Sequence, residues 1–556
     1  MSKSNKPRTG GRILADQLRV HGVERTFCVP GESYLALLDA LYDTPEISLI
    51  VCRHESGAAM MADAYGKLTG RPGVCLVTRG PGATNASAGV HIAYQDSTPF
   101  VLLIGQVARG VVDRESFQEI DFRRMFGQMA KWVAQIDAAS RIPEYLSRAF
   151  YTATAGRAGP VVLALPEDML TEQAAVDDAE PYRIIQSHPG ADEMNRLREL
   201  LSACTRPLMI LGGSGWTREA CEDIKTFAAT SNIPVGVSFR CQHLFDNTHP
   251  SYVGDIGIGV NPQLGQRVRE ADLLLVVGAR LGEMTTSGYT LLDVPQPRQR
   301  LVHVYPGVEE LGRVYQPTLA INAGMPAFAA AVRALTPVDS LAWEANTVQA
   351  RSDYLAYIEP TVGPGELQLA EVVGWLRENL PTDAIVANGA GNYTAWVHRF
   401  YQYRSFRSQL APTSGSMGYG VPAAVAAKAQ YPERIVVCFA GDGCFLMTGQ
   451  ELATAVQYGL NIVILVVNNG MYGTIRMHQE RNYPGRVSGT SLINPDFAAL
   501  ARAYGAYGEL VERTADFPAA FERAIAAGKP ALLELRIDPE AITPRTTLSE
   551  IRKGVK

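Results

Sequence analysis

Residues 441–469 read GDGCFLMTGQELATAVQYGLNIVILVVNN, and this stretch decides the expected fold. The apolar run 435–440 that precedes it predicts a buried parallel strand ending at the first glycine. Residues 449–458 have the apolar period of a helix, and residues 462–467 predict a second buried strand. The stretch therefore predicts a strand, a helix and a neighbouring strand of one parallel sheet.

Asp442 and Asn469 each lie two residues after the last residue of one of these predicted strands. Doubly wound sheets bind ligands at the carboxyl ends of their strands, so both side chains are expected at one binding edge. Oxygen ligands from Asp442, Asn469 and the backbone carbonyl of Met471 would suit a Mg²⁺ ion that also holds phosphate oxygens. A plain Gly-Asp-Gly turn is the alternative, and the spacing to the Asn pair favours the metal site.

The composition is that of an ordinary globular chain. Its 556 residues are too many for one core and predict about three domains. The net charge of −5 gives no reason to expect nucleic acid or a membrane surface as a partner. No apolar run reaches the length of a membrane span and residues 1–11 lack a signal-peptide core, so a cytoplasmic location is expected. The eight cysteines are scattered without a CxxC pair, which favours free buried thiols.

Three blocks of alternating short apolar strands and helical patterns run along the chain. They predict an α/β fold with three doubly wound parallel-sheet domains. Two polar stretches separate the blocks and are interpreted as linkers. The expected order is a first domain 10–172, a linker 173–190, a central domain 191–335, a linker 336–366, a third domain 367–538 and a C-terminal tail 539–556.

Five motifs follow one another along the chain: RHESGAAMMADAYGKLTG (53–70), RGPGATN (79–85), ESFQE (115–119), TSGSMGYGVPAA (413–424) and the segment from GDG to NN. In this order they resemble the motifs of the thiamine diphosphate (ThDP) enzymes, in their acetolactate synthase-like branch. The resemblance covers about residues 10–550. It implies an enzyme that binds ThDP and Mg²⁺ and has a pyrimidine-binding, a central and a diphosphate-binding domain, in this order.

The resemblance implies catalytic roles for three residues. Glu55 occupies the position of the family's catalytic glutamate and would hydrogen-bond the pyrimidine ring of ThDP. Phe117 and Gln118 match a Phe-Gln pair in which Gln118 would donate to a developing oxyanion on the substrate. Without the motifs, Glu55 would be interpreted as a surface or helix-start glutamate and Gln118 as a solvated loop residue.

The same motifs imply the cofactor-binding residues. Met417 falls where the family places an apolar wedge under the cofactor, although simple core filling is the alternative. Glycines and free backbone N–H groups suit the diphosphate, and Cys444 stands where relatives often carry Ser. The expected set is Gly31, Glu55, Pro81, Asn85, Gly391, Asn392, Tyr393, Gly415, Met417, Gly441, Asp442, Gly443, Cys444, Asn469, Met471, Tyr472 and Gly473.

Two departures from the family pattern bear on the substrate. The loop PGESY places Glu32 and Ser33 beside Gly31, where acetolactate synthases have Gly-Gly-Ala. Glu32 could repel a second 2-oxoacid, act as an acid or base, or simply face solvent. His478 aligns with the tryptophan that shapes the acceptor pocket, so His478 and Arg476 could bind a polar or anionic acceptor. Exposed helix positions are the plain alternative for both.

Lys131 and the central domain raise two further expectations. Lys131 matches a family lysine near the entrance and could meet a substrate carboxylate, with a surface lysine as the alternative. The central domain keeps the turns GGSGW (212–216) and GARLGE (278–283) but lacks the family's flavin pattern. The acidic position after the next strand is occupied by HVYPG (303–307), so FAD binding is doubtful.

The expected reaction makes or breaks a carbon–carbon bond next to a carbonyl. The first expectation is acetolactate synthase-like carboligation, which follows the decarboxylation of a 2-oxoacid such as pyruvate. The second is a 2-oxoacid decarboxylase or a 2-hydroxycarbonyl lyase. A pyruvate oxidase-type oxidoreductase would require flavin, and Glu55 disfavours a non-catalytic ThDP-binding relative. Glu55 and Asp442 lie on different domains, and the family holds the two halves of the cofactor in different subunits, so a homodimer or homotetramer is expected.

Overall fold

The computed structural model describes residues 6–554. Two compact units make up this part of the chain, one of residues 6–185 with 425–430 and one of residues 186–424 with 431–554. The first five residues, and the last two residues of the predicted tail, lie outside the described residues. Over residues 6–554, no helix combines the length and the apolar character needed to cross a bilayer.

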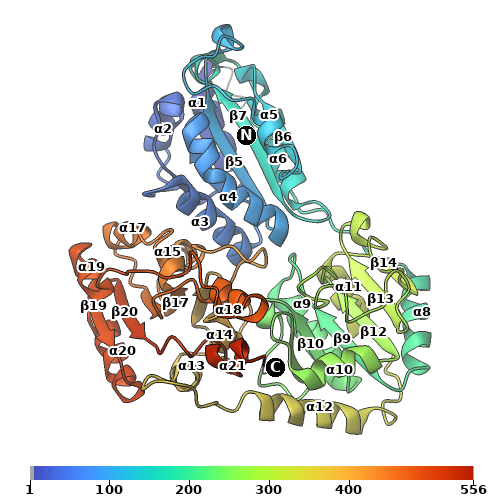
Figure 1. The fold of residues 1–556 in the computed structure, drawn as a ribbon. Coiled ribbons are helices and arrows are strands. Elements are labelled where there is room, and N and C mark those ends of the chain that lie inside the picture. Colours follow the sequence, from blue (N-terminus) through green and yellow to red (C-terminus); the bar gives the residue numbers. More distant parts are fainter. Residues whose placement is uncertain (1–5, 555–556) are drawn as a thin grey trace. The chain divides into compact units, whose positions relative to one another are not determined.

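The first unit is built on a parallel sheet with the strand order β3-β2-β4-β5-β7-β6. Its strands are β2 (Arg25–Cys28), β3 (Ser48–Val51), β4 (Gly73–Val77), β5 (Phe100–Gln106), β6 (Trp132–Gln135) and β7 (Pro160–Pro166), and β1 (Arg8–Thr9) pairs separately with β8 (Gln173–Ala174). Its helices are α1 (Gly10–Val20), α2 (Leu35–Tyr42), α3 (Glu55–Thr69), α4 (Gly80–Asp96), α5 (Phe122–Phe126), α6 (Ile142–Thr154) and α7 (Glu167–Thr171). Figure 1 shows α3 and α4 running together along one face of this sheet.

Two glycines allow α3 to pack tightly against its neighbours. A Cβ on Gly89 of α4 would lie 2.4 Å from the Cβ of Ala59, and a Cβ on Gly73 of β4 would lie 1.8 Å from the carbonyl oxygen of Ala62. Any side chain at these positions would force the backbones apart, so this approach requires glycine. The packing fixes α3 and, with it, Glu55 at the first residue of the helix.

The second unit holds two more parallel sheets. The first of them has the order β11-β10-β9-β12-β13-β14, which is the 3-2-1-4-5-6 order of dinucleotide-binding folds. Its strands are β9 (Pro207–Leu211), β10 (Val235–Ser238), β11 (Tyr252–Ile256), β12 (Leu273–Val277), β13 (Arg300–Tyr305) and β14 (Leu319–Asn322). The helices of this central domain are α8 (Ala191–Ser202), α9 (Arg218–Thr230), α10 (Pro262–Glu270), α11 (Met325–Arg333) and α12 (Glu344–Tyr357).

The third sheet has the order β16-β15-β17-β18-β20-β19, which repeats the topology of the first unit's sheet. Its strands are β15 (Ile385–Asn388), β16 (Gln409–Leu410), β17 (Val436–Gly441), β18 (Val463–Asn468), β19 (Tyr507–Val511) and β20 (Ala531–Arg536). The helices are α13 (Leu369–Asn379), α14 (Thr394–Phe400), α15 (Gly420–Gln430), α16 (Asp442–Phe445), α17 (Glu451–Gln457), α18 (Gly473–Asn482), α19 (Phe497–Ala503), α20 (Phe517–Ala526) and α21 (Leu548–Arg552).

The predicted fold class is confirmed, because all three six-stranded sheets are parallel and helices flank them (Figure 1). The strands predicted at 435–440 and 462–467 are β17 and β18, each displaced by one residue. The segment predicted as the second linker contains α12, and Trp343 and Tyr354 from this segment are buried in the central core. Polar surface residues of α12 conceal this buried side in the sequence, and the domain boundaries themselves remain predictions.

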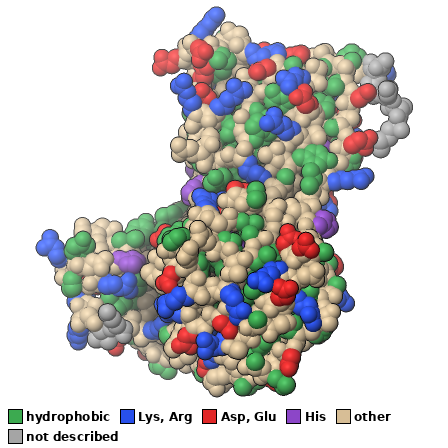
Figure 2. All heavy atoms as spheres, turned by 90° about the vertical axis from the view of Figure 1, so that its right-hand side faces the viewer, with side chains coloured by type: hydrophobic (Ala, Val, Ile, Leu, Met, Phe, Trp, Pro, Cys, Tyr) green, Lys and Arg blue, Asp and Glu red, His purple; other side chains and the backbone are tan. Residues whose placement is uncertain are grey.

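The interior and the surface both agree with the composition. All eight cysteines are buried and free, as predicted. On the face drawn in Figure 2, Lys and Arg side chains are interspersed with Asp and Glu. This face therefore presents no continuous basic field of the kind that attracts nucleic acid.

Candidate active site

The strand order of the first unit reverses between β2 and β4, so the loops after these strands meet at a topological switch point. Ser33, after β2, is buried, and its hydroxyl lies 2.9 Å from that of Thr78, after β4. A Cβ on Gly31 would lie 2.5 Å from the Cβ of Thr78. Glu32 is exposed and lies 3.6 Å from the Arg79 guanidinium. Ser33 thus joins the two loops, whereas Glu32 remains open to solvent.

The structure brings Glu55 and Asn85 together. Asn85 of α4 donates a hydrogen bond from Nδ2 to Oε2 of Glu55 at 2.9 Å. A Cβ on Gly82 would lie 3.5 Å from Oε1, so the glycine leaves space beside this oxygen. Pro81 is exposed in the first turn of α4. The half-buried Glu55 carboxyl is oriented through Oε2, which leaves Oε1 as the oxygen that can bond a ligand.

Phe117 and Gln118 lie on a loop with strained backbone. Gln118 has a φ of 63°, and its carbonyl accepts a hydrogen bond from the first residue of α4 at 3.0 Å. The Glu119 carboxylate accepts from the backbone N–H groups of Asp113 and Ser116 at 2.8 and 3.0 Å. Phe117 is 70% exposed. A non-glycine residue in this conformation persists only where neighbours hold it, and such strain is typical of functional loops.

Lys131 precedes the edge strand β6. Its Nζ donates to the carbonyl oxygen of Ala155 at 2.6 Å, and its stem lies 3.1 Å from the position of a Cβ on Gly159. The Lys131 side chain is exposed, but the hydrogen bond to Ala155 holds it against its own domain. Its contact with a substrate carboxylate remains a prediction.

The third sheet has its own switch point, between β15 and β17. Asp442 follows Gly441, the last residue of β17, and is only 3% exposed. The Gly443 N–H donates to Oδ1 at 2.9 Å, and Asn494 Nδ2 donates to Oδ2 at 2.8 Å. Burial raises the pKa of Asp442, because it disfavours the charged form. A bound cation would favour the ionised carboxylate at this position.

Asn469 and Met471 lie in the turn after β18, which pairs directly with β17. Gly470 supplies the left-handed φ of 67° that this turn requires, and the Asn469 Oδ1 accepts from the Met471 N–H at 3.3 Å. The N–H groups of Gly470 and Met471 also interact with the Asp442 carboxylate. The three predicted ligands are therefore gathered at one edge, and their all-oxygen donor set fits Mg²⁺.

Cys444 ties together the loops around this switch point. Its Sγ accepts hydrogen bonds from the Gly418 N–H at 3.1 Å and the Tyr393 hydroxyl at 3.5 Å. A Cβ on Gly389 would lie 2.4 Å from the sulfur. Burial raises the pKa of Tyr393, so its hydroxyl stays protonated and donates. The Cys444 sulfur thus connects the loops that carry Gly418 and Tyr393.

Asn392 is held by residues that the motifs do not identify. Its Oδ1 accepts from the Thr474 hydroxyl at 2.8 Å, and its Nδ2 donates to the Ile542 carbonyl oxygen at 3.0 Å. Thr474 follows Gly473 in the first turn of α18. Gly391 has a φ of 150°. The position of Thr474 after the Tyr-Gly pair is the only sequence signal for its role.

Gly415 and Met417 lie on the loop before α15. Gly415 is exposed with a φ of 73°, which suits a carbonyl presented to a ligand. Met417 is half-buried and packs against the core of the third sheet. A Cβ on Gly443 would lie 2.5 Å from the Tyr472 ring, so glycine lets this aromatic ring cover the Asp442 loop. The wedge role of Met417 remains a prediction.

Arg476 and His478 lie on α18 but differ in their surroundings. Arg476 donates to the fully buried Glu480 at 2.9 Å. Glu480 also accepts two hydrogen bonds from Arg552 of α21, at 2.8 and 2.9 Å. His478 is exposed. Arg476 is thus engaged by a buried carboxylate, which makes His478 the more accessible of the two for an acceptor substrate.

Glu480→Gln is expected to lower the free energy of unfolding by about 1 to 3 kcal/mol at pH 7, since charge-assisted hydrogen bonds are lost. The hydrogen bonds from Arg552 lower the pKa of Glu480 to about 2, from an ordinary value of 4.5. Its contribution to stability is therefore complete above pH 4.5 and is lost as the pH falls toward 2. Urea unfolding at pH 7 and pH 3 measures this difference. The exposed Glu433→Gln is the control, and an equal effect of both variants would contradict the prediction.

Comparison with known proteins decides the family. Models of the "Thiamine pyrophosphate enzyme" match as N-terminal TPP binding domain (8–125), central domain (194–332) and C-terminal TPP binding domain (389–535). The chain is 30% identical over 536 residues to the acetolactate synthase isozyme 2 large subunit of Escherichia coli (strain K12), covering 95% of both chains. The chain belongs to the thiamine pyrophosphate enzyme family.

Further members of this family give the same picture. The acetolactate synthase large subunit of Corynebacterium glutamicum is 31% identical over 536 residues, covering 93% of this chain and 84% of that protein. The corresponding protein of Parasynechococcus marenigrum is 33% identical over 528 residues, covering 91% and 84%. The chain is therefore an acetolactate synthase-like ThDP enzyme.

ThDP, with Mg²⁺, is the cofactor of this enzyme. When bound, ThDP supplies a carbon nucleophile for carbonyl groups and stabilises the negative charge that develops there. Asp442, Asn469 and Met471 would hold Mg²⁺ and the diphosphate, and Glu55 would hold a proton at Oε1 toward the pyrimidine ring. The geometry of both clusters fits these roles.

The switch point of the central domain lies between β9 and β12, where a dinucleotide would bind in a fold of this strand order. A Cβ on Gly213 would lie 2.0 Å from the Gly278 carbonyl oxygen, so the two turns touch each other. The buried Trp216 donates from its indole nitrogen to the Gly212 carbonyl oxygen at 2.8 Å. Thr217 caps α9, the helix whose N-terminus would meet a pyrophosphate. These contacts hold the two turns together, and the lack of FAD remains a prediction that rests on the missing flavin pattern.

We expect the purified protein to lack the flavin absorbance near 450 nm. Addition of FAD should change neither the thermal midpoint nor the turnover with ThDP and Mg²⁺, because the central domain lacks the family's flavin pattern. Spectrophotometry of the purified protein and a thermal shift assay with FAD measure both. One equivalent of bound flavin would contradict the prediction.

Proposed function

We propose that this enzyme removes CO₂ from a 2-oxoacid such as pyruvate and joins the remaining acyl carbon to the carbonyl carbon of a second substrate. The product is a 2-hydroxy ketone or, when the acceptor is another 2-oxoacid, a 2-hydroxy-3-oxo acid. CO₂ is the leaving group, and the acceptor oxygen takes up a proton. This is the acetolactate synthase-like reaction.

The observation that carries the proposal is the Glu55–Asn85 pair. A carboxyl group that is oriented through Oε2 and free at Oε1 can exchange a proton with a pyrimidine ring, which is the task assigned to it. The carboxylate, amide and carbonyl oxygens around Asp442 provide the metal and diphosphate end. Gln118 lies on a loop that its neighbours hold in place, and its side chain is available to donate a hydrogen bond to an oxyanion on the substrate.

The assembly belongs to the same proposal. Glu55 and Asp442 lie in different units, and the active site is completed by a second copy of the chain in a homodimer or homotetramer. Light scattering of the active protein tests this, and an active monomer would contradict it. A cytoplasmic location is part of the proposal as well.

The reaction is tested by incubating the protein with pyruvate, ThDP and Mg²⁺ and identifying the products by mass spectrometry. Separate reactions contain 2-oxobutyrate, glyoxylate or acetaldehyde as the second substrate. Acetolactate or a mixed acyloin supports carboligation. Release of acetaldehyde alone would replace it by a decarboxylase, and no turnover with ThDP bound would remove pyruvate as the donor.

His478 is proposed to influence the choice of acceptor, because it is exposed where acetolactate synthases have a tryptophan. His478→Trp is the variant that tests this role. A higher ratio of 2-oxobutyrate to glyoxylate product in the variant supports it. An unchanged ratio would assign His478 to the helix surface only.

A further inference from the structure

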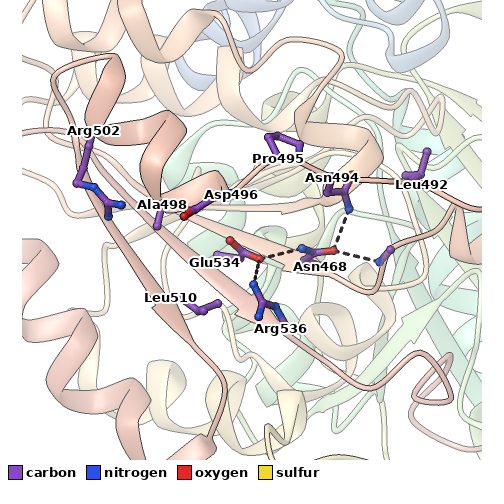
Figure 3. A pocket seen from close by; sticks show the side chains of 11 residues that line it. Asn468, Leu492, Asn494, Pro495, Asp496, Ala498, Arg502, Leu510, Glu534 and Arg536 are labelled. Atoms are coloured by element: carbon purple, nitrogen blue, oxygen red, sulfur yellow. Dashed lines mark hydrogen bonds and ion pairs between the residues drawn. The ribbon is translucent and has the colours of Figure 1, made fainter.

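Asn494 connects the Asp442 carboxylate to the end of strand β18. Its Nδ2 donates to Asp442 Oδ2 at 2.8 Å and also to Asn468 Oδ1 at 2.9 Å. Figure 3 shows the second of these hydrogen bonds. Asn494 comes from the loop before α19, 26 positions after Asn468, and belongs to none of the family motifs quoted above. A side chain from a distant loop therefore bonds directly to a predicted metal ligand.

The orientation of the Asn494 amide is fixed by these two neighbours. Both are acceptor oxygens, so an inverted amide would place oxygen against oxygen. In the present orientation, the Asn494 Oδ1 is buried and has no hydrogen-bond partner among the described residues. A buried polar atom without a partner calls for an explanation. Here the fold leaves one oxygen unsatisfied while both amide hydrogens are directed at Asp442 and Asn468.

A network of hydrogen bonds between charged and amide groups holds Asn468 in place. Asn468 donates from Nδ2 to Oε1 of the buried Glu534 at 2.9 Å, and Arg536 donates to the same oxygen at 3.1 Å. Figure 3 shows the residues of this network lining a pocket. The volume of the pocket is about 490 Å³. Glu534 lies on β20, which pairs with β18, so the hydrogen-bond network is held by the sheet itself.

We infer that Asn494 is a positioning residue that holds the Asp442 carboxylate in the orientation that binds Mg²⁺. The rotation of an aspartate carboxylate is broad unless neighbours fix it. Gly443 donates to Oδ1 and Asn494 donates to Oδ2, so both oxygens of the carboxylate are oriented by a hydrogen bond. The inference rests on the proposed Mg²⁺ site. Loss of such an outer partner typically weakens metal binding by about 10- to 100-fold.

The test is calorimetric titration of Mg²⁺ into the full chain with saturating ThDP. Asn494→Leu keeps the branching and the number of side-chain heavy atoms but has no donor, and we expect its Mg²⁺ Kd to rise by about 10- to 100-fold. The thermal midpoint without Mg²⁺ should stay unchanged, because Asn468 Oδ1 still accepts from the Gly470 N–H at 3.0 Å. Asn379→Leu is the control, since its amide bonds only the backbone of its own helix α13.

Each outcome separates the inference from the proposed function. A wild-type Mg²⁺ Kd in Asn494→Leu overturns the inference, and so does a lower midpoint without Mg²⁺ that is accompanied by an unchanged Kd. A wild-type protein that binds neither Mg²⁺ nor ThDP overturns the proposed function instead. Asn494→Ala removes the same donor with a smaller side chain and gives the same test if the leucine variant does not fold.

Discussion

Glu55→Gln is expected to lower turnover by about 100-fold or more while ThDP remains bound. An amide at this position cannot exchange the proton that a carboxyl exchanges through Oε1. The amide oxygen can still accept the hydrogen bond from Asn85, so the position of α3 should not change. Turnover is measured as 2-oxoacid consumption at saturating cofactor, and ThDP binding is measured by calorimetry.

Glu24→Gln serves as the control for this variant. Glu24 lies in the same unit and is exposed, and its side chain pairs with Arg71 at the surface. Its replacement should leave turnover at the wild-type level. Full turnover of Glu55→Gln would mean that another group handles the proton, and it would remove the catalytic assignment of the Glu55–Asn85 pair.

Asp442→Asn is expected to weaken Mg²⁺ binding by more than about 100-fold, because the only charged member of the proposed ligand set becomes neutral. The stabilisation of the wild-type protein by ThDP and Mg²⁺ should disappear in the variant. At ligand concentrations of 100 times Kd, this stabilisation corresponds to about 2.7 kcal/mol. Thermal unfolding with and without the two ligands measures the loss.

When the metal is removed, the same substitution should no longer lower the stability of the protein. Burial raises the pKa of Asp442, so above the usual aspartate pKa the ionised carboxylate costs free energy in the metal-free fold. Asp442→Asn should therefore be at least as stable as the wild type in urea with a chelator at pH 7. A variant that binds Mg²⁺ like the wild type would show that Asp442 is not a ligand.

Much of the fold could be predicted because its signals are local. The buried strands β17 and β18 are continuous apolar runs, and the turn residues Asp442 and Asn469 follow them in the sequence. Parallel strands share one carboxyl edge, so strand order alone brings such turns together. Helix α12 was concealed because its buried residues, such as Tyr354, are few among polar ones.

The sequence by itself determined the three parallel sheets, the motif order and the residues at the strand ends, because periodicity and turn chemistry act over a few residues. Only the tertiary structure decided which side chains meet. It joined Asn85 to Glu55, Asn494 to Asp442, and Arg552 to Glu480. All three pairs join segments far apart in the chain, and they depend on packing that brings donor and acceptor within about 3 Å.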